Sequence, residues 1–153
     1  MSAYPFLLAL HLAGVIVWVG GMFFAYQCLR PAAAQLLDVA PRLSLWQAVL
    51  GRFFFWVWCA VVVIPASGLA ILLPVGFAAA PLRWHLMLSL GTLMIGLFLH
   101  VYFAPYAALR RAVAGEDWAA GGAALARIRR LVGVNLLLGL AVILIATLGR
   151  LYE

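Results

Sequence analysis

Three histidines are the side chains in this sequence best suited to bind a metal or a cofactor. His11, His85 and His100 all lie in strongly apolar stretches. An imidazole inside a membrane is costly unless it has a polar partner, so such residues often mark functional sites. Imidazole binds copper well and is also the usual protein ligand of a haem iron. The histidines therefore predict a copper site or a haem site, with hydrogen bonding between helices as the structural alternative.

Spacing limits which of these residues can share one copper ion. His11 and His85 are expected in the same, outer half of the membrane, on spans that run in the same direction. His85 and His100 are separated by 15 positions, about 22 Å along a helix, so they cannot bind one ion together. Met22 offers a thioether that would face His100 in the inner half, and copper(I) accepts thioether together with imidazole. The candidate metal ligands are His11, His85, His100 and Met22.

A b-type haem would use the same histidines differently. It needs axial imidazoles and a slot between helices that small residues leave open. Three histidines allow at most one haem with two histidine ligands. The candidate ligands are His11 with His85 or His100, the slot is expected at Gly14, Gly21 and Gly96, and Arg52 or Arg83 would meet a propionate.

The elements that position these residues are membrane helices. The chain has 153 residues, of which 69% are apolar and 9% charged, a composition far from that of a soluble domain. Four apolar segments are long enough to cross a bilayer, at about 4–28, 50–73, 82–106 and 131–149. We expect a single all-α domain over residues 1–153, a bundle of four transmembrane helices without a removable signal peptide.

The arginines predict how this bundle lies in the membrane. All ten basic residues are arginines, and eight of them belong to the loops and helix ends between the first and second spans and between the third and fourth spans. The positive-inside rule puts these loops in the cytoplasm and both termini on the opposite side, which is the periplasmic side if the membrane is a bacterial inner membrane. The formal charge of +6 is therefore expected to serve orientation in a lipid bilayer and not nucleic-acid binding.

Helical wheels assign each span an inward face. Such a face carries small or polar residues, through which membrane helices approach one another. The inward face expected for the fourth span is Asn135, Gly139, Ala146 and Gly149, with Asn135 as a hydrogen-bonding link between helices. The faces expected to point inward in the first three spans are His11, Gly14, Trp18, Gly21, Met22 and Ala25; Arg52, Trp56, Cys59, Val63, Ser67 and Ala70; and His85, Ser89, Thr92, Gly96, His100 and Phe103.

Several classes of function lack the residues that they require. No Asp, Glu or Lys lies in any of the four spans, whereas proton-coupled transporters usually need a carboxylate relay in the membrane. No hydrolase nucleophile arrangement, phosphate-binding loop or Cys-x-x-Cys motif is present. These absences favour a role without catalysis and leave an enzymatic role open.

The sequence resembles the CopD family, the copper resistance protein D membrane domain. The matching residues are His11-x6-Trp18-x-Gly20-Gly21, Leu29-Arg30-Pro31, Arg52-Phe53-Phe54, Ser67-Gly68 and Trp84-His85. This resemblance implies copper transport or homeostasis at the inner membrane, with copper received from a periplasmic carrier. A homodimer is compatible with the surface glycines.

The first span and the histidines of the third are also similar to those of HemJ-type protoporphyrinogen oxidases. That likeness implies a haem b and electron transfer on a porphyrinogen. In that group a lysine commonly stands two residues after the span-three histidine, where this chain has Met87. We therefore expect copper before haem as the ligand, with a non-catalytic accessory subunit as the third alternative.

Overall fold

The computed structural model describes residues 3–149, which form four long helical rods joined by three short loops. No strand is present among these residues, and the predicted all-α, four-helix architecture is confirmed. Two of the rods contain a π-helical turn, at Ala25–Leu29 and at Tyr102–Tyr106. The helices are α1 (Tyr4–Phe24), α2 (Arg30–Leu36), α3 (Val39–Leu72), α4 (Leu82–Val101), α5 (Ala107–Ala114) and α6 (Trp118–Leu148).

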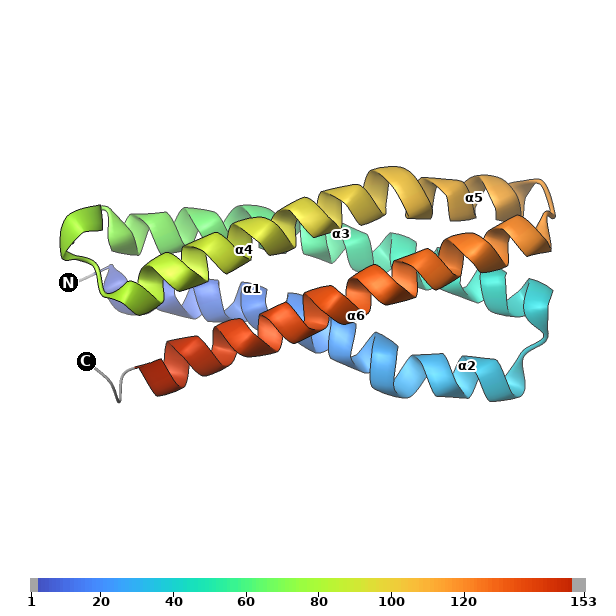
Figure 1. Cartoon of the computed structure of the whole chain (residues 1–153), viewed down its shortest axis with the longest axis horizontal. Coiled ribbons are helices and arrows are strands. Elements are labelled where there is room, and N and C mark those ends of the chain that lie inside the picture. The colour runs from blue at the N-terminus through green and yellow to red at the C-terminus, as the bar shows by residue number, and fades with distance from the viewer. Residues whose placement is uncertain (1–2, 150–153) are drawn as a thin grey trace.

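Each rod is long and apolar enough to cross a membrane, and the chain is a multi-pass membrane protein. The rods contain 31 to 34 residues, which corresponds to about 46–51 Å at 1.5 Å per residue. A hydrocarbon core is only about 30 Å thick, so the rods extend beyond it. The start of α1 and the end of α6 lie at the same end of the bundle (Figure 1). Each predicted span lies on one rod. Each rod extends beyond its span at the end of the bundle that lies opposite the start of α1 and the end of α6.

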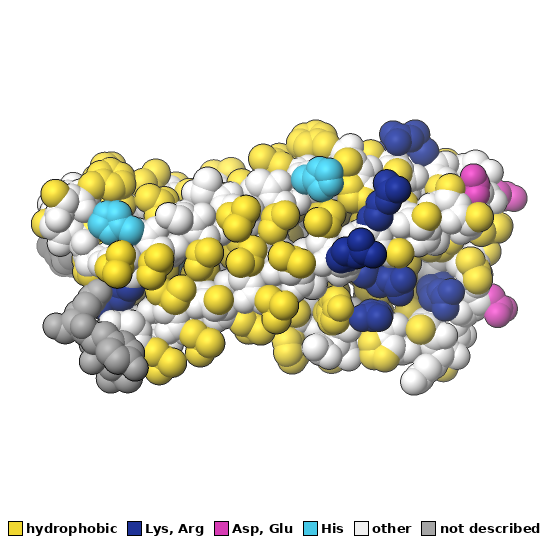
Figure 2. Space-filling model, viewed as in Figure 1, with side chains coloured by type: hydrophobic (Ala, Val, Ile, Leu, Met, Phe, Trp, Pro, Cys, Tyr) yellow, Lys and Arg dark blue, Asp and Glu magenta, His cyan; other side chains and the backbone are white. Residues whose placement is uncertain are grey.

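Charge divides the two ends of the bundle. Most of the basic side chains visible in Figure 2 gather in the half that contains α2, α5 and the start of α6, and acidic side chains lie at its tip. The acidic residues of the described chain are Asp38, Glu116 and Asp117, all in loops. We refer to this end as the basic end.

Local sequence explains where the rods stop. Gly76 follows α3 with φ +83°, a conformation that glycine adopts without steric cost. At the start of α6 the Asp117 side chain accepts a hydrogen bond from the Ala120 N–H at 2.9 Å, a typical N-cap. Pro105 lies in the π-helical turn Tyr102–Tyr106, and the rod continues through it.

An aromatic cluster occupies the centre of the bundle. Phe54 of α3 is only 2% exposed. Its ring contacts three aromatic rings of the third rod, which runs from α4 through the π-helical turn into α5. The ring centroids lie 5.6 Å from Phe98, 6.0 Å from Tyr102 and 5.0 Å from Tyr106, all edge to face. Such pairs add about 0.5–1.5 kcal/mol each beyond simple burial. The cluster therefore ties α3 to the rod formed by α4 and α5.

The inward faces predicted for α1 and α6 are confirmed at five positions, and their other residues are half-buried. In α1 the residues Gly14, Trp18 and Met22 are buried, and in α6 Asn135 and Gly139 are buried. Both helices place glycine where another helix comes close. The small-residue rule therefore identifies the packed face of these two helices.

The inward face predicted for the second span is wrong except at Ser67, which is buried. Arg52, Trp56 and Cys59 are exposed, and the buried face of α3 instead includes Leu50, Phe54, Val57 and Ala60. The physical reason is that lipid is as apolar as the bundle core. Hydrophobicity therefore does not determine which face of the helix is buried. The packing of the large Phe54 ring determines it.

The inward face predicted for the third span is also wrong. Ser89, Thr92, Gly96, His100 and Phe103 are exposed, and the buried residues of α4 are Met94, Phe98 and Val101. The two hydroxyls need no helix opposite them, because Ser89 donates to the His85 carbonyl and Thr92 to the Leu88 carbonyl, each at 2.8 Å. Such local bonds satisfy a hydroxyl on any face of a helix.

Gly139 allows three helices to converge, and its replacement tests this packing. A Cβ atom at this position would lie 2.9 Å from Val19 Cγ2 on α1 and 3.2 Å from Met94 Cε on α4. We expect Gly139→Ala to lower the free energy of unfolding by about 1–3 kcal/mol, the usual cost of overpacking. Thermal unfolding in detergent measures the change.

Gly91→Ala is the matched control, because no atom lies within 4 Å of the position of its added Cβ. Alanine is favoured over glycine in a helix by up to about 1 kcal/mol, so this variant should be neutral or more stable. Equal melting temperatures for the two variants would contradict the packing that we describe.

Candidate functional site

His11 is the histidine that the fold holds in a defined position. Its Nδ1 lies 3.0 Å from the Ile64 carbonyl oxygen and 3.2 Å from Ser67 Oγ, both on α3. Ser67 itself is buried and donates its hydroxyl proton to the Val63 and Ile64 carbonyls, at 2.6 and 3.1 Å. Both groups near the imidazole therefore accept, which assigns the proton of the neutral ring to Nδ1. The tautomer that follows leaves a lone pair on Nε2.

Glycines make room for this contact between α1 and α3. A Cβ atom at Gly68 would lie 3.2 Å from His11 Cε1, and one at Gly14 would lie 2.7 Å from Ile64 Cγ1. Either methyl group would press on the imidazole or on the residue that binds it. The Ser67-Gly68 pair, one turn beyond Pro65, therefore has a direct role in seating His11. In the sequence this pair stood out only among the residues that match the CopD family, and nothing linked it to His11.

The other two histidines are in different surroundings. His85 is half-buried near the start of α4, and its Nδ1 lies 3.3 Å from the Pro81 carbonyl of its own first turn. His100 is exposed on the outside of α4. The expectation that all three histidines are buried in the bundle is wrong. His11 and His85 are half-buried, and His100 is exposed. Phe98 and Val101 of the same helix fill the core, so His100 lies on the lipid-facing surface of α4.

Met22 and Arg52 differ from the histidines in their surroundings. Met22 is 2% exposed and lines a central cavity with Phe98 and Val101, whereas His100 lies on another face of α4. Arg52 is exposed at the basic end of α3. Within residues 3–149, no three His, Cys, Asp or Glu side chains come together in a way that could hold a metal ion.

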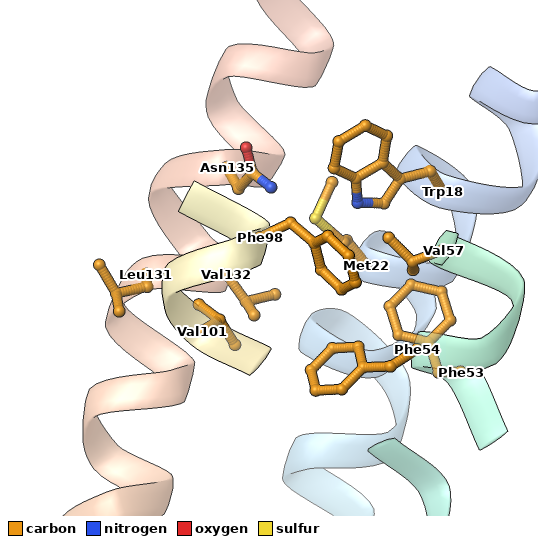
Figure 3. A pocket seen from close by; sticks show the side chains of 10 residues that line it. All are labelled: Trp18, Met22, Phe53, Phe54, Val57, Phe98, Val101, Leu131, Val132 and Asn135. Carbon is orange, nitrogen blue, oxygen red and sulfur yellow. The ribbon is translucent and has the colours of Figure 1, made fainter. Parts of the chain in front are cut away.

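The central cavity is small and almost entirely apolar (Figure 3). Its volume of about 10 Å³ is near the minimum for one water molecule. Asn135 is its one amide: Nδ2 donates to the Met94 carbonyl at 3.4 Å, and Oδ1 is buried without a partner in the described chain. The first bond links α6 to α4, as expected of a residue that joins helices.

The structure does not fit a haem at the predicted slot. Gly14 packs against Ile64 and Gly21 against Phe53, so side chains of α3 occupy the space beside both glycines. Gly96 lies on the exposed face of α4. The central cavity would admit a water molecule and not a porphyrin.

Comparison with protein families identifies what this arrangement belongs to. The family described as Copper resistance protein D, CopD, matches residues 47–148, about two thirds of the chain. The chain belongs to the CopD family. The matched segment covers most of α3 and all of α4, α5 and α6, and therefore includes the seat of His11 at Ile64, Ser67 and Gly68. Comparisons with curated proteins and with solved structures gave no match.

The protonation of His11 is directly measurable. The two acceptors beside Nδ1 predict that the neutral ring carries its proton there and that Nε2 is bare. In protein with ¹⁵N-labelled histidine, NMR should show one histidine, assigned by its loss in His11→Gln, with a protonated Nδ1 and an unprotonated Nε2. His100→Gln should leave that signal in place. A proton found on Nε2 at neutral pH would contradict the assignment.

Proposed function

We propose that this protein handles copper at the bacterial inner membrane, in copper transport or homeostasis, and that His11 is a ligand for copper(I) in transit. Membership of the CopD family supports copper as the cargo. The observation that carries the role of His11 is the 3.0 Å contact of its Nδ1 with the Ile64 carbonyl oxygen.

That contact gives His11 the form of a metal ligand. Histidines that bind metals usually donate their other ring N–H to a carbonyl or carboxylate, which fixes the tautomer and raises the basicity of the free nitrogen. The Ile64 carbonyl and Ser67 occupy this supporting position at His11. His85 has a longer contact of 3.3 Å within its own helix, so its seat depends less on the fold.

A single well-held histidine suits cargo better than a resident metal. Transit requires a site that binds strongly enough to admit an ion and weakly enough to release it. Copper(I) accepts imidazole and thioether ligands, and the carboxylates of the described chain are confined to loops. The chemistry therefore favours a soft ion over a proton or a hard cation.

The charge distribution supports a location of this site on one side of the membrane. If the basic end faces the cytoplasm, as the positive-inside rule requires, His11 lies in the periplasmic half. It lies seven positions beyond the start of α1, about 10 Å along the helix. Copper would then arrive from the periplasm, and a periplasmic copper carrier would be the donor.

Competition with a coloured copper(I) chelator tests this function in detergent-purified protein. We expect one copper(I) per chain in the wild type and a dissociation constant at least 10-fold higher in His11→Ala. Gly68→Ala should weaken binding to a smaller degree, because its methyl group presses on the imidazole. Uptake of copper(I) into vesicles containing the same variants should fall in the same order.

His100→Ala is the matched control, since it removes an exposed imidazole from the opposite half of the bundle. It should change copper binding by less than twofold. His11→Met, which retains a soft ligand, should bind better than His11→Ala if copper contacts this position. Unchanged binding in His11→Ala, with a wild-type melting temperature, would overturn the proposal.

A further inference from the structure

A second site lies at the basic end, between the first rod, α3 and α6. Here a crevice with an enclosed volume of about 20 Å³, against about 10 Å³ for the central cavity, has walls of apolar and aromatic side chains. Tyr26 and Phe53 form part of one side, and Ile128 and Val132 form part of the other. The side chains of Arg30 and Arg129 also line this crevice, from the first rod and from α6. Two arginines beside one apolar crevice are unusual within a membrane bundle, where each charge is costly.

The crevice lies where the backbone of the first rod passes from α1 into α2. α1 passes into α2 through the π-helical turn Ala25–Leu29, directly before Arg30. In Figure 1, α2 runs apart from α6 at this end. Single π-turns of this kind occur often at functional sites. Here the turn places Tyr26 under Arg30, whose guanidinium carbon lies 5.0 Å from the centre of the ring.

The two arginines differ from their neighbours. Arg30 and Arg129 are half-buried, whereas Arg127 and Arg130 on either side of Arg129 are exposed. Within residues 3–149, neither Arg30 nor Arg129 forms an ion pair with a carboxylate. In Figure 2 the basic side chains gather around this end, with the acidic ones set apart at its tip. These two charges are therefore open to pairing with an anion from outside the chain.

Their depth corresponds to the headgroup layer. Arg129 lies 19 positions before Leu148 at the other end of α6, about 28 Å along the helix. This length is close to the thickness of the hydrocarbon core. If α6 crosses the core from its C-terminal end, Arg129 emerges where lipid phosphates lie.

We propose that this crevice binds one anionic phospholipid. Its phosphate would lie between the guanidinium groups of Arg30 and Arg129, and an acyl chain would follow the apolar walls. Guanidinium groups suit phosphate because they donate parallel hydrogen bonds. Basic pockets between helices on the cytoplasmic side of membrane proteins bind lipid headgroups in this manner. Free phosphate would gain nothing from the apolar walls, which is why the crevice favours a lipid.

Native mass spectrometry of delipidated protein tests the site, because it counts lipids bound to the intact chain. Phosphatidylglycerol and phosphatidylcholine with identical acyl chains are the two probes. We expect one phosphatidylglycerol to bind at least 10-fold more tightly than phosphatidylcholine. Arg30→Gln with Arg129→Gln should abolish this preference. Inorganic phosphate at millimolar concentration should neither displace the lipid nor raise the melting temperature.

Arg127→Gln with Arg130→Gln is the matched control, because it removes the same charge from the exposed neighbours of Arg129. It should retain the preference within twofold. Should the first double variant fold poorly without lipid, Arg129→Gln alone replaces it. Equal binding of the two lipids by the wild type, or equal losses in both double variants, would overturn the proposal. So would displacement of the lipid by phosphate. Copper binding enters none of these measurements, so this test is independent of the proposed function.

Discussion

Close contact between α1 and α3 is the constraint on which the rest of the structure depends. Helices in a bilayer gain little by burying apolar surface, because lipid is equally apolar. They associate where their backbones approach, and here Gly14 and Gly21 of α1 receive Ile64 and Phe53 of α3. The same approach brings His11 Nδ1 to the Ile64 carbonyl oxygen. Packing and the seat of the histidine are thus two results of one contact.

The two ends of the bundle differ in their charged side chains. One end has His11 and the loop between α3 and α4, with few charges. The other has most of the arginines, the π-helical turns and the longer helical extensions (Figures 1 and 2). The aromatic cluster around Phe54 and the central cavity lie between them and leave room for little more than a water molecule. Copper passing along the chain's interior would need this region to rearrange, whereas docking at His11 would not.

Sequence reasoning found the packed face of α1 and α6, where Gly14 and Gly139 lie against another helix, and failed for most of α3 and for α4, where Gly96 was assigned inward and is exposed. In α1 and α6, glycines identify the contact because only they allow close approach. In α3 and α4 the polar residues Arg52, Ser89 and Thr92 were assigned inward, yet all three are exposed. Ser89 and Thr92 satisfy their hydroxyls on their own helix, so polarity gave no information about direction. The crevice at Arg30 and Arg129 was missed for a related reason, since the arginines were assigned to orientation alone.

The sequence by itself determined the class of the protein, the number of its helices, the charge difference between its ends and its likeness to the CopD family. These follow from composition, from segment length and from short motifs, all of which are local. Only the tertiary structure decided that His11 is held by α3, that His100 lies outside, and that Arg30 and Arg129 share one crevice. Those relations depend on the rotation of each helix about its axis. In an apolar solvent that rotation is decided by the packing of side chains such as Phe54 and not by hydrophobicity.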